Sequence, residues 1–188
     1  MNAKIVAILA LCAALLCAAC VPRSEGEQGM NPEQKAAVEA AEHLHSIEEF
    51  ERDVEPAIIA ARNEFLTQET IVGLFANDYI DELYADSTPL YSLRARSYTF
   101  SETDADRIRA VYDAKLKPLG FTMWEKRDSE MVLSVWTNAS YSASVDVITH
   151  VGIQSSTSYS AGPLRSDGST EDPSVFLPLE GREPEWLT

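Results

Sequence analysis

The sequence predicts a single α+β domain in which helices lie on one face of a mainly antiparallel sheet. Apolar residues recur at helical spacing over residues 37–65, and segments rich in β-branched and aromatic residues follow one another after residue 120. Short links between consecutive strands favour antiparallel pairing. The predicted order is one long helix, a strand, a second helix, and then a run of three or four strands.

The long N-terminal helix is predicted to begin at Asn31, because Pro32 suits the first helical position and Gln34 completes the spacing of a capping box. Pro56 interrupts this pattern, since proline has no backbone N–H to donate. The segment is therefore either one helix kinked at Pro56 or two helices that meet near Glu55. The apolar or small residues at helical spacing are Ala37, Ala41, Leu44, Ile47, Val54, Ile58, Ala61 and Phe65.

The remaining elements follow from shorter patterns. Residues 78–84 favour a helical turn or two, whereas residues 91–100 alternate partly and predict one strand. Ser101–Asp104 offers a cap for a second helix, whose apolar residues run from Ile108 to Leu119 before Gly120 stops it. The later strands are predicted at residues 121–126, 131–136, 142–149 and 153–160.

Domain boundaries follow from composition. We expect one α+β domain over residues 31–162 and a proline-rich C-terminal tail over residues 163–188, which holds four of the nine prolines. Residues 21–30 show no apolar periodicity and are predicted to form a flexible tether of roughly 18 Å root-mean-square length.

The N-terminus has the pattern of an export signal. Lys4 precedes an uncharged apolar run over residues 5–16. This run is too short to cross a bilayer, which needs about 20 apolar residues. It fits the apolar region of a secretory signal peptide.

The sequence Cys17-Ala18-Ala19-Cys20 resembles the lipobox of bacterial lipoproteins, in which small residues precede an acylated cysteine. Ala18 and Ala19 match that pattern, while Cys17 stands where leucine is usual. The resemblance implies that residues 1–19 are cleaved and that Cys20 carries a diacylglyceryl anchor with palmitate-type chains. The protein would then lie at the extracytoplasmic face of the cell membrane. The alternative is an ordinary signal peptide that releases a soluble protein. Signal, size and element order also resemble small uncharacterised lipoproteins of actinobacteria.

Composition excludes several classes of function. The chain has 15 basic and 30 acidic residues, a net charge of −15. Nucleic acids are bound through lysine and arginine clusters, so a nucleic-acid partner is not expected. Removal of residues 1–19 leaves Cys20 as the remaining cysteine, so no disulfide can form within the chain.

Several motifs that can serve metal binding or catalysis also fit simpler structural roles. Glu42 and His45 have the three-residue spacing of a di-iron helix motif, but the second such motif that a di-iron site needs is missing. His45 and Glu49 also have the spacing of a surface pair on a helix. His150 has serines nearby in the sequence but no G-x-S-x-G elbow. The sequence therefore predicts no catalytic residue, no metal site and no cofactor.

Two pairs of residues remain as candidate ligand contacts. Arg94 and Arg96 share one face of a predicted strand, where they can meet a carboxylate or phosphate ligand or pair with acids of this chain. Trp124 and Trp136 lie on strands predicted to pair, and packing is favoured over a sugar platform.

The leading functional hypothesis is a membrane-anchored extracytoplasmic lipoprotein that acts as a non-enzymatic binding or interaction module of the cell envelope. Its partners would be the membrane, through the lipid, and an envelope protein. The alternatives are a cell-envelope hydrolase with a dispersed Ser/His/acid site and an envelope assembly factor that docks through an exposed stripe on residues 37–65.

Overall fold

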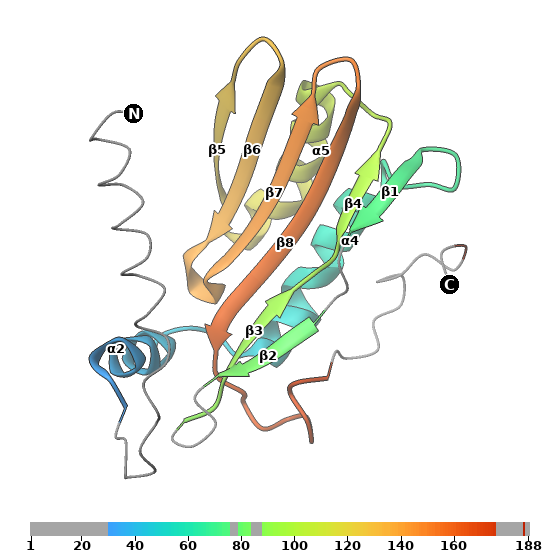
Figure 1. Cartoon of the computed structure of the whole chain (residues 1–188). Helices are drawn as coiled ribbons and strands as arrows, with labels where there is room; N and C mark the ends of the chain where they lie inside the picture. Colours follow the sequence, from blue (N-terminus) through green and yellow to red (C-terminus); the bar gives the residue numbers. More distant parts are fainter. Residues whose placement is uncertain (1–29, 76–78, 84–87, 176–185, 187–188) are drawn as a thin grey trace, which may run out of the picture. The chain divides into compact units, whose positions relative to one another are not determined.

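The computed structural model of the chain describes residues 30–75, 79–83, 88–175 and 186. The chain divides into Met1–Asn31 and Pro32–Thr188, and the described fold belongs to the second unit. That unit is an antiparallel sheet with helices packed on one face, which confirms the predicted fold class (Figure 1).

The predicted N-terminal helix is divided before Ser46, in addition to the predicted junction near Glu55. Helix α2 (Pro32–Ala41) ends, and α3 (Ile47–Glu49) begins behind a capping box at Ser46. The Ser46 hydroxyl accepts from the Glu49 amide at 3.0 Å, and the Glu49 carboxylate accepts from the Ser46 amide at 2.9 Å. This reciprocal cap satisfies amide groups that would otherwise lack partners, so a new helix begins here.

The helix then continues through Pro56. The π-helical segment η2 (Phe50–Val54) joins α3 to α4 (Glu55–Asn63), and the Glu55 amide donates to the Phe50 carbonyl across this wider turn. Pro56 therefore lies in the first turn of α4, where a missing N–H is tolerated. The π-helical segment gives way to α4 at Glu55, where the sequence predicted a kink or a junction of two helices.

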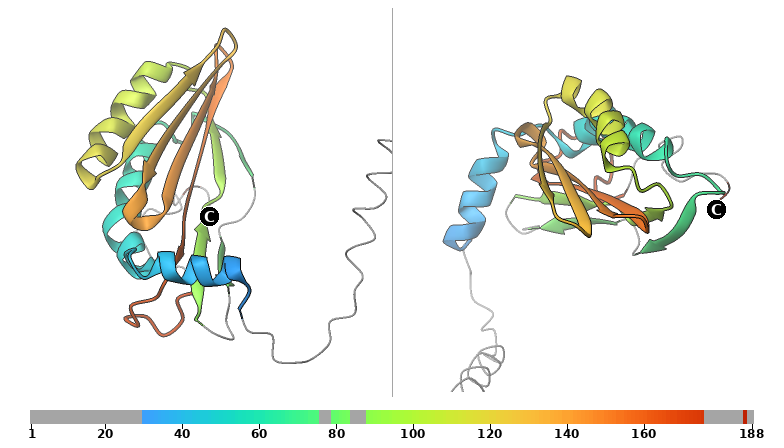
Figure 2. Two further views of the ribbon diagram at one scale, coloured as in Figure 1. Left: turned by 90° about the vertical axis from the view of Figure 1, so that its left-hand side faces the viewer. Right: turned by 90° about the horizontal axis from the view of Figure 1, so that it is seen from above.

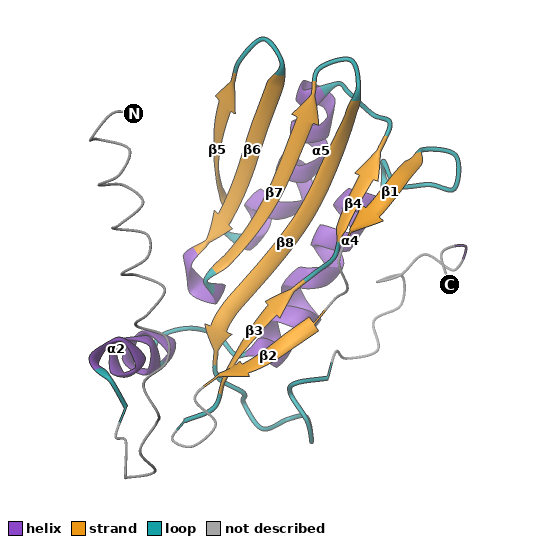
Figure 3. Ribbon diagram, in the orientation of Figure 1, coloured by secondary structure: helices purple, strands orange, loops and turns teal. Residues whose placement is uncertain are grey.

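The sheet is antiparallel in every described pair, and its strands are ordered β1-β4-β8-β7-β6-β5 (Figure 3). Strand β8 pairs with β7 along one edge, and along the other edge it pairs with β4 and then with β3. Strand β2 pairs with β3. The bounds are β1 (Ile71–Phe75), β2 (Tyr79–Leu83), β3 (Leu90–Arg94), β4 (Ser97–Phe100), β5 (Thr122–Arg127), β6 (Met131–Asn138), β7 (Ala143–His150) and β8 (Gln154–Leu164), with α5 (Ala105–Leu116) between β4 and β5.

Two local predictions in the first half of the chain were wrong. The segment predicted as a helical turn contains strand β2, which pairs residue by residue with β3. The single strand predicted over residues 91–100 is two strands, interrupted at Ala95 and Arg96. The Ala95 amide still donates to the Tyr159 carbonyl at 3.0 Å, so β8 holds both halves in place. Pairing with a long neighbour decided these conformations, and local propensity did not.

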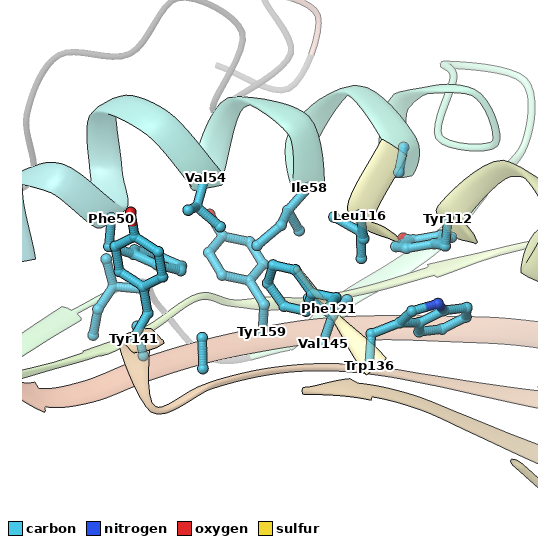
Figure 4. Packing of buried hydrophobic residues seen from close by; sticks show 14 of the residues in the cluster. Phe50, Val54, Ile58, Tyr112, Leu116, Phe121, Trp136, Tyr141, Val145 and Tyr159 are labelled. Carbon is cyan, nitrogen blue, oxygen red and sulfur yellow. The ribbon is translucent and has the colours of Figure 1, made fainter. Parts of the chain in front are cut away.

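The core lies between the sheet and the helices α4 and α5, which share one side of the sheet (Figure 2). Tyr112 of α5 stacks on Trp136 of β6 at 5.0 Å between ring centroids, and the Trp136 indole N–H donates to Asp113 at 2.8 Å. The apolar stripe of the helix over residues 47–65 is buried here. The core includes Phe50, Val54, Ile58, Tyr112, Leu116, Phe121, Trp136, Tyr141, Val145 and Tyr159 (Figure 4).

Candidate functional site

Alternation along the strands gives the sheet two chemically different faces. Trp136, Val145 and Tyr159 point toward the helices and are buried (Figure 4). Side chains alternate between the two faces of a strand, so the residues next to these three point the other way. The views in Figure 2 show no described helix over that opposite side of β5, β6 and β7. We call this side the open face.

The pairing register defines three neighbouring cross-strand rows of side chains on the open face, which cross from β5 through β6 and β7 to β8. The first row consists of serine and threonine, and each of the other two has a serine on β8. The three rows are, in order, Thr122–Thr137–Ser144–Ser160, extended by Arg94 of β3; Trp124–Val135–Asp146–Ser158; and Lys126–Leu133–Ile148–Ser156, extended by Thr99 of β4.

Hydroxyl groups in the first row contact one another across the strands. The Thr122 and Thr137 hydroxyls lie 3.2 Å apart, and those of Ser144 and Ser160 lie 3.4 Å apart. Ser144 also donates to the Asp146 carboxylate at 3.3 Å. A hydroxyl can donate one hydrogen bond and accept two, so these groups keep capacity for a ligand.

A shallow depression of about 380 Å³ lies at the end of this row, where β5, β6 and β7 approach the β6–β7 turn. It is open on one side, and hydroxyl and amide groups contribute to its wall. Its lining residues are Gly120, Thr122, Thr137, Asn138, Ala139, Ser142, Ala143 and Ser144.

Trp124 lies beside this depression, two residues along β5 from Thr122 on the same face. Its side chain is 50% exposed, whereas Trp136 is fully buried. Trp136 thus packs in the core as predicted, while Trp124 lies on the sheet face with half of its surface exposed.

Contacts on the covered face hold β5 in position beneath Trp124. Glu125 accepts from the Ser134 hydroxyl at 3.0 Å and pairs with Arg127 and, at 3.5 Å, with Arg109 of α5. The hydrogen bond from Arg127 lowers the pKa of Glu125 below its ordinary value. The ion pairs therefore fasten an edge strand, and with it Trp124, to the helix layer.

Asp146 places an acid in the middle of the open face. Burial among the neighbouring strands raises the pKa of its carboxyl group, and the hydrogen bond from Ser144 opposes part of that rise. Val135, next to it in the same row, is only 6% exposed. The centre of the open face therefore combines a closely packed valine with a partly buried carboxyl group, between Trp124 on one side and Ser158 on the other.

Comparison with known proteins identifies the family. A model described as Domain of unknown function (DUF4853) matches residues 43–172, which include every strand of the open face. The chain belongs to the DUF4853 family. It is also similar to the crystal structure of a DUF4853 family protein from Actinomyces odontolyticus, with 15% identity, a TM-score of 0.49, and coverage of 73% of this chain and 80% of that one. No curated protein matches the chain.

The predicted arginine pair does not lie on one continuous strand of this DUF4853 domain. Arg94 ends β3, is exposed, and joins the open face opposite Ser160. Arg96 lies in the interruption between β3 and β4, is half-buried, and has a buried Nε atom. Of the two, the register places Arg94 with the first row. A ligand contact by either arginine stays a prediction.

His43 and His45 lie outside the sheet, whereas strand alternation places His150 on the open face, in a fourth row with Met131 and Gln154. His45 Nδ1 lies 3.0 Å from the Glu49 carboxylate, as predicted for a surface pair, and its ring stacks on Tyr141 at 4.6 Å. Helix α2 ends at Ala41, so Glu42 and His45 do not share a helix face as the sequence suggested. His150 is exposed at the end of β7. The described ranges contain no group of three His, Cys, Asp or Glu residues arranged for a metal ion.

Two predictions concern the membrane. Cys20, the predicted lipidation site, lies outside the described residues. Within the ranges that the structure describes, no helix is both long enough and apolar enough to cross a bilayer.

The open face was not recognised from the sequence. Strand β8 reads Gln-Ser-Ser-Thr-Ser-Tyr-Ser, with hydroxyl side chains on both faces, so periodicity does not separate the buried Ser155 and Thr157 from the outward Ser156 and Ser158. The usable signal was the contrast between Trp124, which precedes the charged residues 125–127, and Trp136, which follows a largely apolar run.

Proposed function

We propose that this DUF4853 protein is a lipoprotein anchored to the extracytoplasmic face of the cell membrane, where it binds a component of the cell envelope through the open face, without catalysis. The observation that carries the binding role is this face itself. It combines one exposed indole, a cross-strand row of hydroxyls and an adjoining depression.

The anchor is supported by the N-terminal pattern. A short apolar run is followed by Ala18, Ala19 and Cys20, as in bacterial lipoproteins. More than one acyl chain on Cys20 is sufficient for stable membrane attachment.

The chemistry of the open face supports binding rather than catalysis. Nucleophilic catalysis by a serine needs a base within hydrogen-bond reach. The hydroxyls of Ser144 and Ser160 contact each other, and Ser144 also donates to Asp146. His150 lies in the row at the other end of this face, six residues along β7 from Ser144. Hydroxyl groups of this kind suit hydrogen bonding to a ligand.

Thiol labelling in intact cells tests the location and the binding role together. The mature chain would have no cysteine other than the acylated Cys20, so Ser158→Cys introduces one reactive thiol on the open face. Lys115→Cys on the exposed side of α5 is the matched control. A membrane-impermeant maleimide should label the control equally in cells and after solubilisation. It should label Ser158→Cys more slowly in cells, because the envelope component covers the face.

The same experiment has an arm for the anchor. Cys20→Ala should move the protein from the membrane fraction to the medium or the soluble envelope fraction, whereas Cys17→Ala should leave it in the membrane. Equal labelling of Ser158→Cys before and after solubilisation would refute binding through the open face. Retention of Cys20→Ala in the membrane, or no labelling of Lys115→Cys in intact cells, would refute the proposed anchor and location.

A further inference from the structure

We propose that the ligand of the open face is a neutral saccharide chain that stacks on Trp124 and extends along the first row of hydroxyls into the depression. This inference rests on the proposed function and deepens it by naming the class of ligand.

Trp124 provides the stacking surface. Half of its side chain is exposed, although the protein has a fully buried tryptophan one strand away in Trp136. An indole combines a large apolar ring with a polar N–H, which suits a ligand that has both apolar and polar faces. Saccharide rings have this character, since their C–H groups form apolar patches between hydroxyls. Ion pairs of Glu125 with Arg109 and of Arg127 with Asp106 join β5 to α5, so the strand that carries the indole is held against the helix layer.

The first row provides matching hydrogen-bond groups. The hydroxyls of Thr122, Thr137, Ser144 and Ser160 form two contacting pairs, at 3.2 Å and 3.4 Å. Each hydroxyl can both donate and accept, as a sugar hydroxyl can. Neighbouring strands lie about 4.8 Å apart, so the row repeats the same group at regular intervals across the face. An extended ligand can therefore make similar contacts on successive strands.

The depression can hold one end of the saccharide chain. Thr122, Thr137 and Ser144 belong both to its wall and to the first row, so it continues the same surface. Its volume of about 380 Å³ falls at the lower end of the range of about 300–1,000 Å³ that small-ligand sites occupy. It is therefore suited to one or two sugar rings and not to a folded partner.

Charge and composition argue against other ligands. Phosphate-rich ligands need clustered cations, and the three rows hold only Arg94 and Lys126, at opposite margins, in a chain of net charge −15. The centres of protein–protein interfaces are depleted in serine and lysine and enriched in aromatic residues. The open face has many serines and a single large exposed apolar side chain, Trp124, among its rows. A neutral polyhydroxylated ligand fits this combination best.

Calorimetric titration of the full chain tests the proposal. The protein would be purified from membranes in a detergent without a sugar headgroup, because a glycoside detergent would compete. The probes are soluble oligomers of N-acetylglucosamine, of glucose and of mannose. At least one of them should bind, and Trp124→Ala should weaken that binding by about tenfold or more, since aromatic anchors dominate binding energies. Trp124→Phe should retain part of the affinity.

Matched variants separate this effect from a general loss of structure. Phe75→Ala removes another exposed aromatic side chain, 63% exposed on β1, and should leave the affinity unchanged. Thr137→Val removes one hydroxyl at nearly constant shape and should weaken binding. A cooperative thermal unfolding transition for each variant, compared with that of the unchanged chain, serves as the control for folding.

Two outcomes would overturn the inference. One is that no oligosaccharide binds, and the other is that Trp124→Ala binds as tightly as the unchanged chain. If Ser158→Cys is nevertheless protected in cells, the open face binds a different component, and the proposed function stands without the saccharide. If protection in cells is also absent, both fail.

Discussion

Replacement of Glu48 with alanine should detach the segment after β8 from helix α3. The Glu48 side chain is 2% exposed and accepts hydrogen bonds from the hydroxyls of Ser166 and Thr170 and from the Asp167 amide. The Asp167 and Thr170 contacts are both 3.0 Å. One buried carboxyl group thus gathers three donors from a segment that the sequence assigned to a loop-like tail.

The expected cost follows from these contacts. A hydrogen bond contributes about 1 kcal/mol net, and a buried donor left without a partner adds to the loss, so Glu48→Ala should cost about 3 kcal/mol or more. In a domain of this size each kcal/mol shifts the melting temperature by about 2–4 °C, which gives a decrease of about 6–12 °C. Ser166 and Thr170 share Oε1, whereas the Asp167 amide uses Oε2. Glu48→Gln can therefore keep two of the three hydrogen bonds and should cost about 1 kcal/mol.

Thermal unfolding and amide hydrogen exchange of residues 20–188, with Cys20→Ser, provide the assay. Glu48→Ala should lower the melting temperature and remove the protection of the Asp167 amide. The control is Glu39→Ala on the exposed face of α2, which should stay within about 0.5 kcal/mol of the unchanged chain. If Glu48→Ala melts like this control and the Asp167 amide stays protected, the assigned role of Glu48 is wrong.

Two further substitutions test the open face and the end of β8. Burial raises the pKa of Asp146, so the folded state binds that proton more tightly than the unfolded state, and the carboxylate form opposes folding at neutral pH. Asp146→Asn should therefore raise the melting temperature at pH 7, and the gain should vanish below about pH 3.5; an equal gain at both pH values would contradict this. Gly162 has φ +100°, and an added Cβ would collide with the Tyr91 carbonyl oxygen. Gly162→Ala should cost more than about 2 kcal/mol, against about 1 kcal/mol for Gly152→Ala, which meets open space; comparable melting temperatures would show that the β3–β8 contact can adjust.

The N-terminal helix shows how far periodicity predicts a structure. The apolar positions from Ile47 to Phe65 pack in the core as predicted, because burial on one face imposes helical spacing. The junction at Glu55 lies where the sequence predicted it, whereas the division before Ser46 was not predicted. A capping box at Ser46 and a π-helical turn before Pro56 form these two boundaries, and both depend on hydrogen bonds within a few residues. Proline therefore indicated one of the two helix boundaries.

The strands before α5 depended on partners that are distant in the sequence. Strand β3 pairs with residues 160–164 and β4 with residues 155–157, so one long strand orders two short ones. The later strands pair with their neighbours in the sequence and were predicted within a few residues. Local hairpins are visible in a sequence pattern, whereas non-local pairing is not.

Composition and local spacing are sufficient to predict the fold class, the apolar face of the helix, the strands after residue 120 and the acidic character of the chain. The sequence also supplies the export pattern that ends at Cys20, on which the proposed anchor rests. The tertiary structure alone decided which face of the sheet the helices cover. The helices buried Trp136 on the face that they cover and left Trp124 exposed on the other. The pairing of the strands separated Arg94 from Arg96 and aligned hydroxyls from neighbouring strands. The physical reason is that a strand pattern gives two faces but does not say which one a distant helix will cover.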